Sequence, residues 1–201
     1  MSKLIIHGPL KSRAQRVIWM ANELGLDYEM RTPNFRDGST RTPEYLAVNR
    51  AGHVPAIELD GFTMGESCAI NIYLAEKFGR LMPEGAEARA QVLEWSFWVM
   101  TDVERRLNPY IYHRKLLPEA ERDPRIIAWV EREIPWPMTV IDRHLAGHDW
   151  PVGDSFSVAD LNAAAVFFLG LLAELDFSGH PNLKEWLDRC LSRPAFEREE
   201  L

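Results

Sequence analysis

Residues 52–74 read GHVPAIELDGFTMGESCAINIYL, and this stretch decides the fold of the first part of the chain. Two short apolar runs, Ala56–Leu59 and Phe62–Met64, flank the dipeptide Asp60-Gly61. Asp-Gly between two apolar runs is a strong signal for a β-hairpin with a two-residue turn. The apolar positions that follow, as far as Phe78, have helical spacing and are followed by a glycine. The stretch therefore predicts two antiparallel strands followed by a helix.

The residues before this stretch alternate between strand and helix signals. Leu4–His7 is a short apolar run typical of a buried strand, and the apolar positions between Val17 and Leu24 have helical spacing. Asp27–Arg31 is expected to form a second strand, which makes a β-α-β unit with a parallel pair and a right-handed crossover. Pro43–Leu46 indicates a short helix. The predicted order is βαβ-α-ββα, an α/β domain with a mixed sheet.

The character of the chain changes at about residue 87, after which only helical patterns appear, interrupted by prolines. Residues 81–86 are expected to be a linker. We therefore expect an α/β domain over residues 1–80 and an all-α domain over residues 87–201. Within the latter, Ser157-Val158-Ala159-Asp160 is a capping box, in which Ser157 and Asp160 satisfy each other's backbone N–H groups. The helix that it starts, Val158–Leu172, is apolar nearly all round and should be central.

Composition excludes several classes of protein. Of the 201 residues, 46% are hydrophobic and 26% charged, which fits a globular protein and not a disordered one. The longest apolar stretch, Ala163–Ala173, is too short to span a bilayer, and no secretory signal begins the sequence, so we expect a cytoplasmic protein. Two distant cysteines and six unclustered histidines predict neither a disulfide framework nor a metal site. The net charge of −7, with no evident basic face, makes nucleic acid an unexpected partner.

Two features of the first domain indicate a site for a peptide-like ligand. Proline lacks an N–H, and a cis Val54-Pro55 bond would turn the backbone sharply and leave the Val54 N–H and C=O free to pair with an extended peptide. Glu66-Ser67 stands where the last helix begins, and the free N–H groups of a helix start suit a carboxylate. The Glu66 side chain would meet a neighbouring ammonium group. The alternative is an ordinary helix start after a hairpin, with Ser67 as its cap.

Six motifs along the chain are specific in combination: Arg16-Val17, Glu23-Leu24-Gly25, Asn49-x-x-Gly52-x-Val54-Pro55-Ala56, Asp60-Gly61, Glu66-Ser67-x-Ala69-Ile70-x-x-Tyr73-Leu74 and Phe156-Ser157-Val158-Ala159-Asp160. Together they resemble the cytosolic glutathione transferase family over nearly the entire chain. The family usually has a proline after Asn49, where this chain has Arg50, and we expect this departure to affect a loop and not ligand contacts. The resemblance implies a thioredoxin-like first domain, an all-helical second domain and a homodimer.

The resemblance also implies a ligand and roles for particular residues. Glutathione would be the co-substrate, with Glu66 and Ser67 holding its γ-glutamyl group and Val54 pairing with its cysteinyl backbone. His53 would reach the glycyl carboxylate, with Thr40 or Arg41 in the same region. Asp102 would contribute to glutathione binding by reaching the γ-glutamyl amine in the partner subunit's site. No metal is implied.

The resemblance places the group that activates the thiol in the turn Gly8–Arg13. The reactive form of a thiol is the thiolate, which a nearby hydrogen-bond donor favours. Ser12 has the only hydroxyl in this turn and stands four residues before Arg16, as in the Ser-type, theta-like or related bacterial classes. The alternative is that Ser12 caps the first helix, with Gln15 completing a capping box. Neither Tyr nor Cys occurs between His7 and Val17, which disfavours the classes that use those residues.

The function that these resemblances imply is transfer of glutathione, through its thiolate, to small electrophilic and mostly apolar substrates. Two alternatives remain open from the sequence. One is a glutathione-dependent peroxidase, isomerase or dehalogenase on the same fold, and the other is a non-catalytic, transferase-like interaction module. Fold alone does not decide between them.

Overall fold

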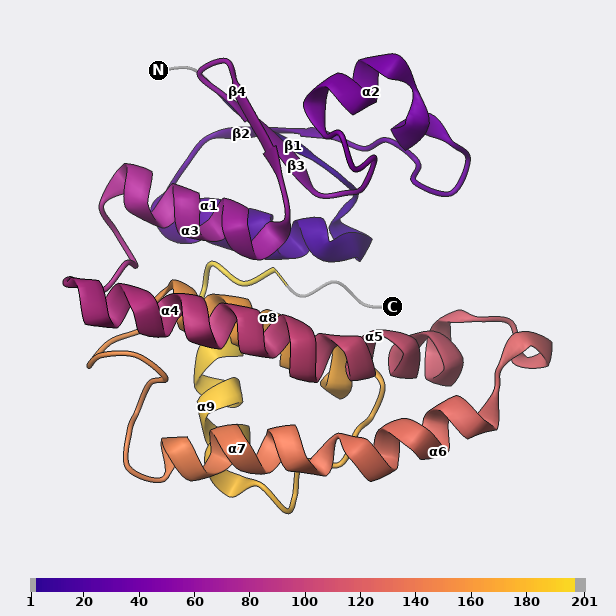
Figure 1. Ribbon diagram of the computed structural model, residues 1–201, viewed down its shortest axis with the longest axis vertical. Helices are drawn as coiled ribbons and strands as arrows, with labels where there is room; N and C mark the ends of the chain where they lie inside the picture. Colours follow the sequence, from indigo (N-terminus) through magenta and orange to yellow (C-terminus); the bar gives the residue numbers. More distant parts are fainter. Residues whose placement is uncertain (1–2, 198–201) are drawn as a thin grey trace. The chain divides into compact units, whose positions relative to one another are not determined.

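The computed structural model describes residues 3–197, which form two compact units (Figure 1). Unit 1 comprises residues 3–82 together with 194–197, and unit 2 comprises residues 83–193. The expected helical domain ran from residue 87 to residue 201, but residues 194–197 belong with unit 1. The last residues of the expected domain, 198–201, lie outside the described part of the chain.

Unit 1 contains a four-stranded mixed sheet and three helices in the predicted order. Strand β1 is parallel to β2 and antiparallel to β3, and β3 is antiparallel to β4, which gives the spatial order β2-β1-β3-β4. The elements are β1 (Leu4–His7), η1 (Leu10–Ala14), α1 (Gln15–Leu24), β2 (Tyr28–Arg31), η2 (Ser39–Arg41), α2 (Pro43–Val48), β3 (Ala56–Leu59), β4 (Phe62–Gly65) and α3 (Ser67–Phe78).

Turn chemistry explains why these elements stop where they do. Asp60 and Gly61, which join β3 to β4, both have positive φ angles, 54° and 79°. Positive φ at both central residues is what a two-residue hairpin turn of type I′ requires. Helices α1 and α3 each end at a glycine in the left-handed conformation, Gly25 and Gly79, as the sequence predicts.

The two faces of the sheet are covered differently. Leu4 and Ile6 of β1 and Ile57 of β3 are buried, and α1 and α3 pack side by side on one face (Figure 1). Side chains alternate along a strand, so His7 follows the buried Ile6 and points to the other face. There it meets Tyr45 of α2, with 5.6 Å between the ring centroids. Helix α2 therefore covers the face that carries His7.

The segment 194–197 packs on α1 of unit 1. The Phe196 ring lies 4.8 Å from the Trp19 ring, centroid to centroid. Asn22 donates from its side-chain amide to the Ala195 carbonyl at 3.2 Å. Gln15 donates to the Glu197 carbonyl at 3.0 Å. The last described residues thus complete the burial of a tryptophan in the first unit.

Unit 2 is all helical, with α8 at its centre. Helix α8 packs against α4, α5 and α9, and nearly all of its side chains are buried. Within residues 3–197, no helix combines the length and apolarity needed to cross a bilayer. The elements of unit 2 are α4 (Ala86–Trp98), η3 (Val99–Glu104), α5 (Arg105–Ile111), η4 (Tyr112–Leu116), η5 (Glu119–Glu121), α6 (Pro124–Glu133), α7 (Pro135–Leu145), α8 (Val158–Leu172) and α9 (Pro181–Leu191).

The predicted capping box at the start of α8 is confirmed. Asp160 Oδ2 accepts from the Ser157 N–H at 2.8 Å and from the Ser157 hydroxyl at 2.9 Å, and the Ala159 N–H donates to Ser157 Oγ at 3.2 Å. The other oxygen of Asp160 accepts from Trp186 Nε1 at 2.9 Å, which ties α9 to α8. Burial raises the pKa of Asp160 to about 6, and the hydrogen bonds that its carboxylate accepts oppose that rise.

The two histidines at the end of α7 interact with each other. Their rings are stacked, with 4.6 Å between the centroids of His144 and His148. His144 also contacts Trp95 of α4 and makes a 3.0 Å hydrogen bond with the Pro151 carbonyl. Burial lowers the pKa of His144, and the neighbouring His148 lowers it further. His144 is therefore partly buried, whereas His148 is exposed.

Candidate functional site

The register of the sheet brings three segments of unit 1 to one end. His7 pairs with Ala56, and Ala56 pairs with Gly65, so these residues form one row across β1, β3 and β4. The turn containing Ser12 leaves β1 after His7. Val54-Pro55 enters β3 just before Ala56, and Glu66-Ser67 leaves β4 just after Gly65. Three separate segments of the sequence therefore meet at the same end of the sheet.

Gly8 allows two of these segments to approach each other closely. Its φ angle is 135°, and a Cβ atom placed on it would lie 3.1 Å from Val54 Cβ and 3.3 Å from Ser12 Oγ. A side chain at this position would therefore be both strained and crowded. Ser12 and Val54 both lie close to the position that a side chain of residue 8 would occupy, so the absence of a side chain lets the two segments approach each other.

Ser12 is held in an extended conformation within the turn, with φ −149° and ψ −176°. Its hydroxyl donates to the Pro9 carbonyl at 2.6 Å and accepts from the Ala14 N–H at 3.1 Å. The alternative interpretation, a capping box of Ser12 with Gln15, is not found, because the Gln15 amide donates to the Glu197 carbonyl instead. The Ser12 hydroxyl thus has a fixed acceptor role toward the helix and one proton that can be redirected.

The Val54-Pro55 peptide bond is cis, and the hypothesis drawn from the proline at the start of this strand is confirmed. Val54 is half-buried, and neither its N–H nor its C=O has a hydrogen-bond partner among residues 3–197. Unpaired backbone groups in a partly buried segment are unusual, because water or a partner normally satisfies them. Val54 therefore offers a hydrogen-bond donor and an acceptor at this end of the sheet, next to Gly8.

The start of α3 is an open helix end. Glu66 occupies the N-cap position with φ 69° and ψ 104°, and no side chain caps the helix. Ser67 is the first helical residue and is buried, with 3% of its surface exposed. Its hydroxyl accepts from Nη1 of Arg16 at 3.4 Å, so the hydroxyl proton remains available. The reading of Ser67 as an ordinary cap is therefore wrong.

Arg16 adds positive charge beneath this helix start. Its side chain comes from α1 and is buried, with 3% of its surface exposed. The N-terminal end of a helix already favours an anion through its free N–H groups and its dipole. A buried guanidinium below it strengthens that field. The end of the sheet thus combines an exposed carboxylate at Glu66 with a site suited to an anion at Ser67.

Comparison with known proteins identifies the family of both units. The N-terminal domain family of glutathione S-transferases matches residues 12–77, and the C-terminal domain family of glutathione S-transferases matches residues 112–194. The chain belongs to the cytosolic glutathione S-transferase family.

Individual transferases match over nearly the whole chain. Glutathione S-transferase 3 of Zea mays is 28% identical over 98% of this chain and 93% of its own length. Glutathione S-transferase 3 of Schizosaccharomyces pombe is 26% identical over 96% of this chain and 84% of its own length. The theta class glutathione S-transferase from Xanthomonas axonopodis pv. citri, solved with glutathione bound, has a TM-score of 0.90 at 26% identity, covering 98% of this chain and 96% of that one.

Within this transferase, His53 lies at the same end of unit 1 as Val54. The His53 side chain is exposed, and its carbonyl accepts from the Tyr45 hydroxyl and from Asn49 Nδ2, both at 2.8 Å. Arg41 donates from Nη1 to the Ala51 carbonyl at 2.7 Å, which places it along the same loop. Thr40 is buried, so its neighbour Arg41 is the better candidate of the two for a ligand contact.

Asp102 belongs to unit 2 and lies in η3. Its carboxylate accepts from the Thr101 hydroxyl at 2.9 Å and lies 3.9 Å from Nη1 of Arg106. Its role in glutathione binding stays a prediction. Among residues 3–197, no group of three or more His, Cys, Asp or Glu side chains is placed to hold a metal ion.

Three residues that shape the site had no role in the sequence analysis: Arg16, Tyr45 and Asn49. Arg16 and Asn49 were noted only as members of motifs. Arg16 directly precedes the apolar positions that begin at Val17, and this neighbourhood is itself a signal, since buried arginines need a partner. No comparable signal marked Tyr45, because an aromatic residue in a short amphipathic helix usually packs in the hydrophobic core, and the sequence does not show what its hydroxyl bonds to.

Proposed function

We propose that this chain is a glutathione transferase whose unit 1 binds glutathione along the end of the sheet. The observation that carries the proposal is the pair of unpartnered backbone groups on Val54, between the open start of α3 and the turn of Ser12. Pairing with Val54 would extend the sheet by one residue of the tripeptide, as in β-strand addition. The family supplies glutathione as the co-substrate.

The two ends of the peptide would be recognised by charge. The γ-glutamyl carboxylate accepts from Ser67 and the N–H groups at the start of α3, with Arg16 below, and the γ-glutamyl ammonium pairs with Glu66. His53 and Arg41 are placed along the loop that leads to Val54, where the glycyl carboxylate would lie. The exposed side chains of Glu66 and His53 reach solvent, as a binding site requires.

Ser12 would stabilise the reacting group. Its hydroxyl turns its proton from the Pro9 carbonyl toward the glutathione sulfur, while the Ala14 N–H continues to donate to Oγ. A donor at the sulfur lowers the pKa of the thiol, whose proton leaves to solvent. The thiolate then forms a bond to the electrophilic atom of the second substrate, and the leaving group departs with the electrons of the bond that breaks; where the thiolate adds to a double bond, the displaced π electrons take up a proton from solvent. For the second substrate we propose a small, mostly apolar compound.

Ser12→Ala tests this assignment. We expect kcat with an electrophilic substrate to fall about 10- to 100-fold, because a hydrogen bond to a charged group contributes about 1.5–3 kcal/mol. The affinity for glutathione, measured by calorimetry, should change less than about threefold, since Val54, Glu66 and Ser67 remain. Ser178→Ala, a surface serine of unit 2, is the matched control. Unchanged turnover in Ser12→Ala would remove Ser12 from the mechanism.

A substrate panel separates the proposed activity from its relatives. Electrophiles, hydroperoxides and disulfides are assayed with glutathione under the same conditions. Turnover of electrophiles above the others supports the transferase, whereas turnover confined to hydroperoxides or to one isomerisation would replace it. Absence of any heat on mixing with glutathione would favour a non-catalytic module. We also propose a cytoplasmic homodimer, which light scattering and cell fractionation test.

A further inference from the structure

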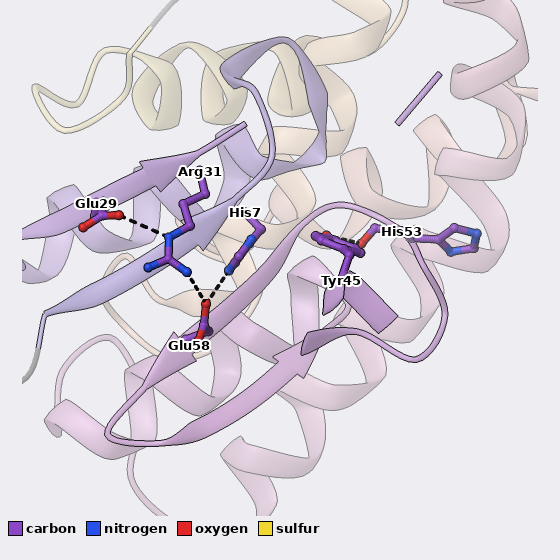
Figure 2. Close-up of polar contacts among 6 residues, drawn as sticks. All are labelled: His7, Glu29, Arg31, Tyr45, His53 and Glu58. Carbon is purple, nitrogen blue, oxygen red and sulfur yellow. Dashed lines mark hydrogen bonds and ion pairs between the residues drawn. The ribbon is translucent and has the colours of Figure 1, made fainter. Parts of the chain in front are cut away.

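Two side chains from α2 and its C-terminal end hold the His53 carbonyl. The Tyr45 hydroxyl and Asn49 Nδ2 each donate to it at 2.8 Å (Figure 2 shows the bond from Tyr45). A carbonyl oxygen has two lone pairs, so both are used. Two donors fix the direction of the C=O bond, and with it the plane of the peptide between His53 and Val54.

Fixing this peptide plane also aims the Val54 N–H. The His53–Val54 bond is trans, so its N–H points in the direction opposite to its C=O. With the C=O held from the side of α2, the N–H is turned away from α2. This N–H has no partner among the described residues, and if Val54 pairs with the cysteinyl residue of glutathione, it donates to the cysteinyl carbonyl.

The Tyr45 hydroxyl is a dependable donor. Tyr45 is 7% exposed, and burial raises its pKa to about 12, so the hydroxyl keeps its proton throughout the neutral range. Its backbone is fixed as well, because the Tyr45 N–H donates to the Thr42 hydroxyl at the start of α2.

The other side of the Tyr45 ring rests on a charged cluster of the sheet. His7 meets the ring edge-on, with an interplanar angle of 73°. Glu58 Oε1 lies 2.8 Å from His7 Nε2 and 2.9 Å from Arg31 Nη1, so it holds the imidazole from the far side (Figure 2). His7 is buried, whereas Arg31 is exposed. The cluster therefore extends from the exposed Arg31 to the buried His7, which contacts the tyrosine that donates to the His53 carbonyl.

We propose that Tyr45 is a positioning residue for glutathione, which acts by holding the His53–Val54 peptide so that the Val54 N–H faces the ligand. This inference rests on the proposed function. It predicts that Tyr45 affects binding of glutathione and leaves the reaction of the bound thiolate nearly unchanged. The His7–Glu58–Arg31 cluster supports the same peptide indirectly, because His7 packs against the Tyr45 ring.

Tyr45→Phe is the main test. It removes only the hydroxyl and leaves Asn49 bonded to the His53 carbonyl, so the fold should persist. We expect the dissociation constant for glutathione, measured by calorimetry, to rise about 5- to 10-fold, as for loss of one buried hydrogen bond. Turnover at saturating glutathione should stay within twofold. Tyr28→Phe, on the edge strand β2, is the matched control and should change neither value.

A modified ligand tests the route of the effect. An analogue of glutathione with a trans-alkene in place of the cysteinyl–glycyl amide has no carbonyl for the Val54 N–H. Wild type should bind it more weakly than glutathione, and Tyr45→Phe should bind it as well as wild type does. If the full weakening in Tyr45→Phe persisted with the analogue, Tyr45 would act elsewhere and the inference would be wrong.

The remaining outcomes are also decisive. Unchanged affinity in Tyr45→Phe, or a loss of turnover with unchanged affinity, overturns the inference. Should Tyr45→Phe not fold, Glu58→Gln carries the test, because it keeps the Tyr45 hydroxyl and weakens the Glu58 contacts with His7 and Arg31. It should raise the dissociation constant about two- to threefold, and no change would overturn the inference. If wild type itself gives no heat with glutathione, the proposed function fails first.

Discussion

The starts of α3 in unit 1 and α8 in unit 2 both place a serine beside an acidic residue, and the structure treats them in opposite ways. At α8, Ser157 and Asp160 satisfy each other and are buried, with 2% and 0% of their surfaces exposed. At α3, Glu66 is exposed with a positive φ, Ser67 does not cap the helix, and a buried arginine lies below.

The difference separates a structural helix start from a binding one. In a closed helix start, the donors and acceptors form hydrogen bonds with one another, and these bonds stabilise the folded protein. An open one keeps its N–H groups and accepts a strained residue, which persists only when the surrounding structure enforces it. Similar residue types therefore carry opposite functions, and the hydrogen bonds already made distinguish them.

Asp160→Asn should give the largest change, because it breaks the closed start. Each oxygen of Asp160 accepts from a donor, so the amide NH₂ must face either Trp186 Nε1 or the Ser157 groups. We expect a loss of about 3 kcal/mol in the free energy of unfolding, from buried donors left unpaired. Urea denaturation measures it. Asp188→Asn, an exposed residue of α9, should change it by less than about 0.5 kcal/mol. Equal losses in the two variants would contradict this account.

At the open start of α3, Glu66→Gly should increase the free energy of unfolding and weaken the binding of glutathione. Glycine adopts a positive φ without strain, so unfolding should cost about 1 kcal/mol more than in wild type. Loss of the carboxylate should weaken glutathione binding about 10-fold. Leu81→Gly is the matched control, since Leu81 has φ 64° and no assigned contact with the ligand. It should show the gain in stability alone, and a loss of affinity there would count against the role of Glu66.

His144, near the end of α7, should have the smallest effect, a pH-dependent contribution to the free energy of unfolding. Burial lowers the pKa of His144 in the folded protein, so the fold favours the neutral imidazole and the unfolded chain takes up the proton more readily. Stability should therefore decline as pH falls below about 6.5, the value expected for an unfolded histidine. In His144→Gln, urea denaturation between pH 7 and pH 5 should show a shallower decline. Parallel declines would show that His144 does not contribute.

Regular patterns and turn residues made the fold predictable. Helix α8 begins and ends where the apolar pattern and the capping box indicate, and the Asp60-Gly61 turn joins β3 to β4 as expected. These features depend on local chemistry, which a sequence displays directly. The cis bond at Val54-Pro55 was foreseen for the same reason, because a proline entering a strand needs a special backbone.

The parts that the sequence did not reveal depend on contacts between distant residues. Gln15 stands where a capping box with Ser12 would need it, but it bonds to Glu197, which is 182 positions away. The positive φ of Glu66 follows from its surroundings and not from its residue type. Tyr45 and His53 are eight positions apart, but their bond depends on how the loop after α2 folds back.

The packing of Phe196 on Trp19 makes unit 1 discontinuous in the sequence. The polypeptide leaves this unit at residue 82 and returns to it at residue 194. During synthesis, the first eighty-two residues leave the ribosome before residues 194–197 are made. Unit 1 is therefore incomplete at that stage, and Phe196, which packs on Trp19, is added only near the end of synthesis. A fragment cut after residue 82 would expose that tryptophan, whereas the same fragment supplied with a peptide of residues 194–197 would cover it again.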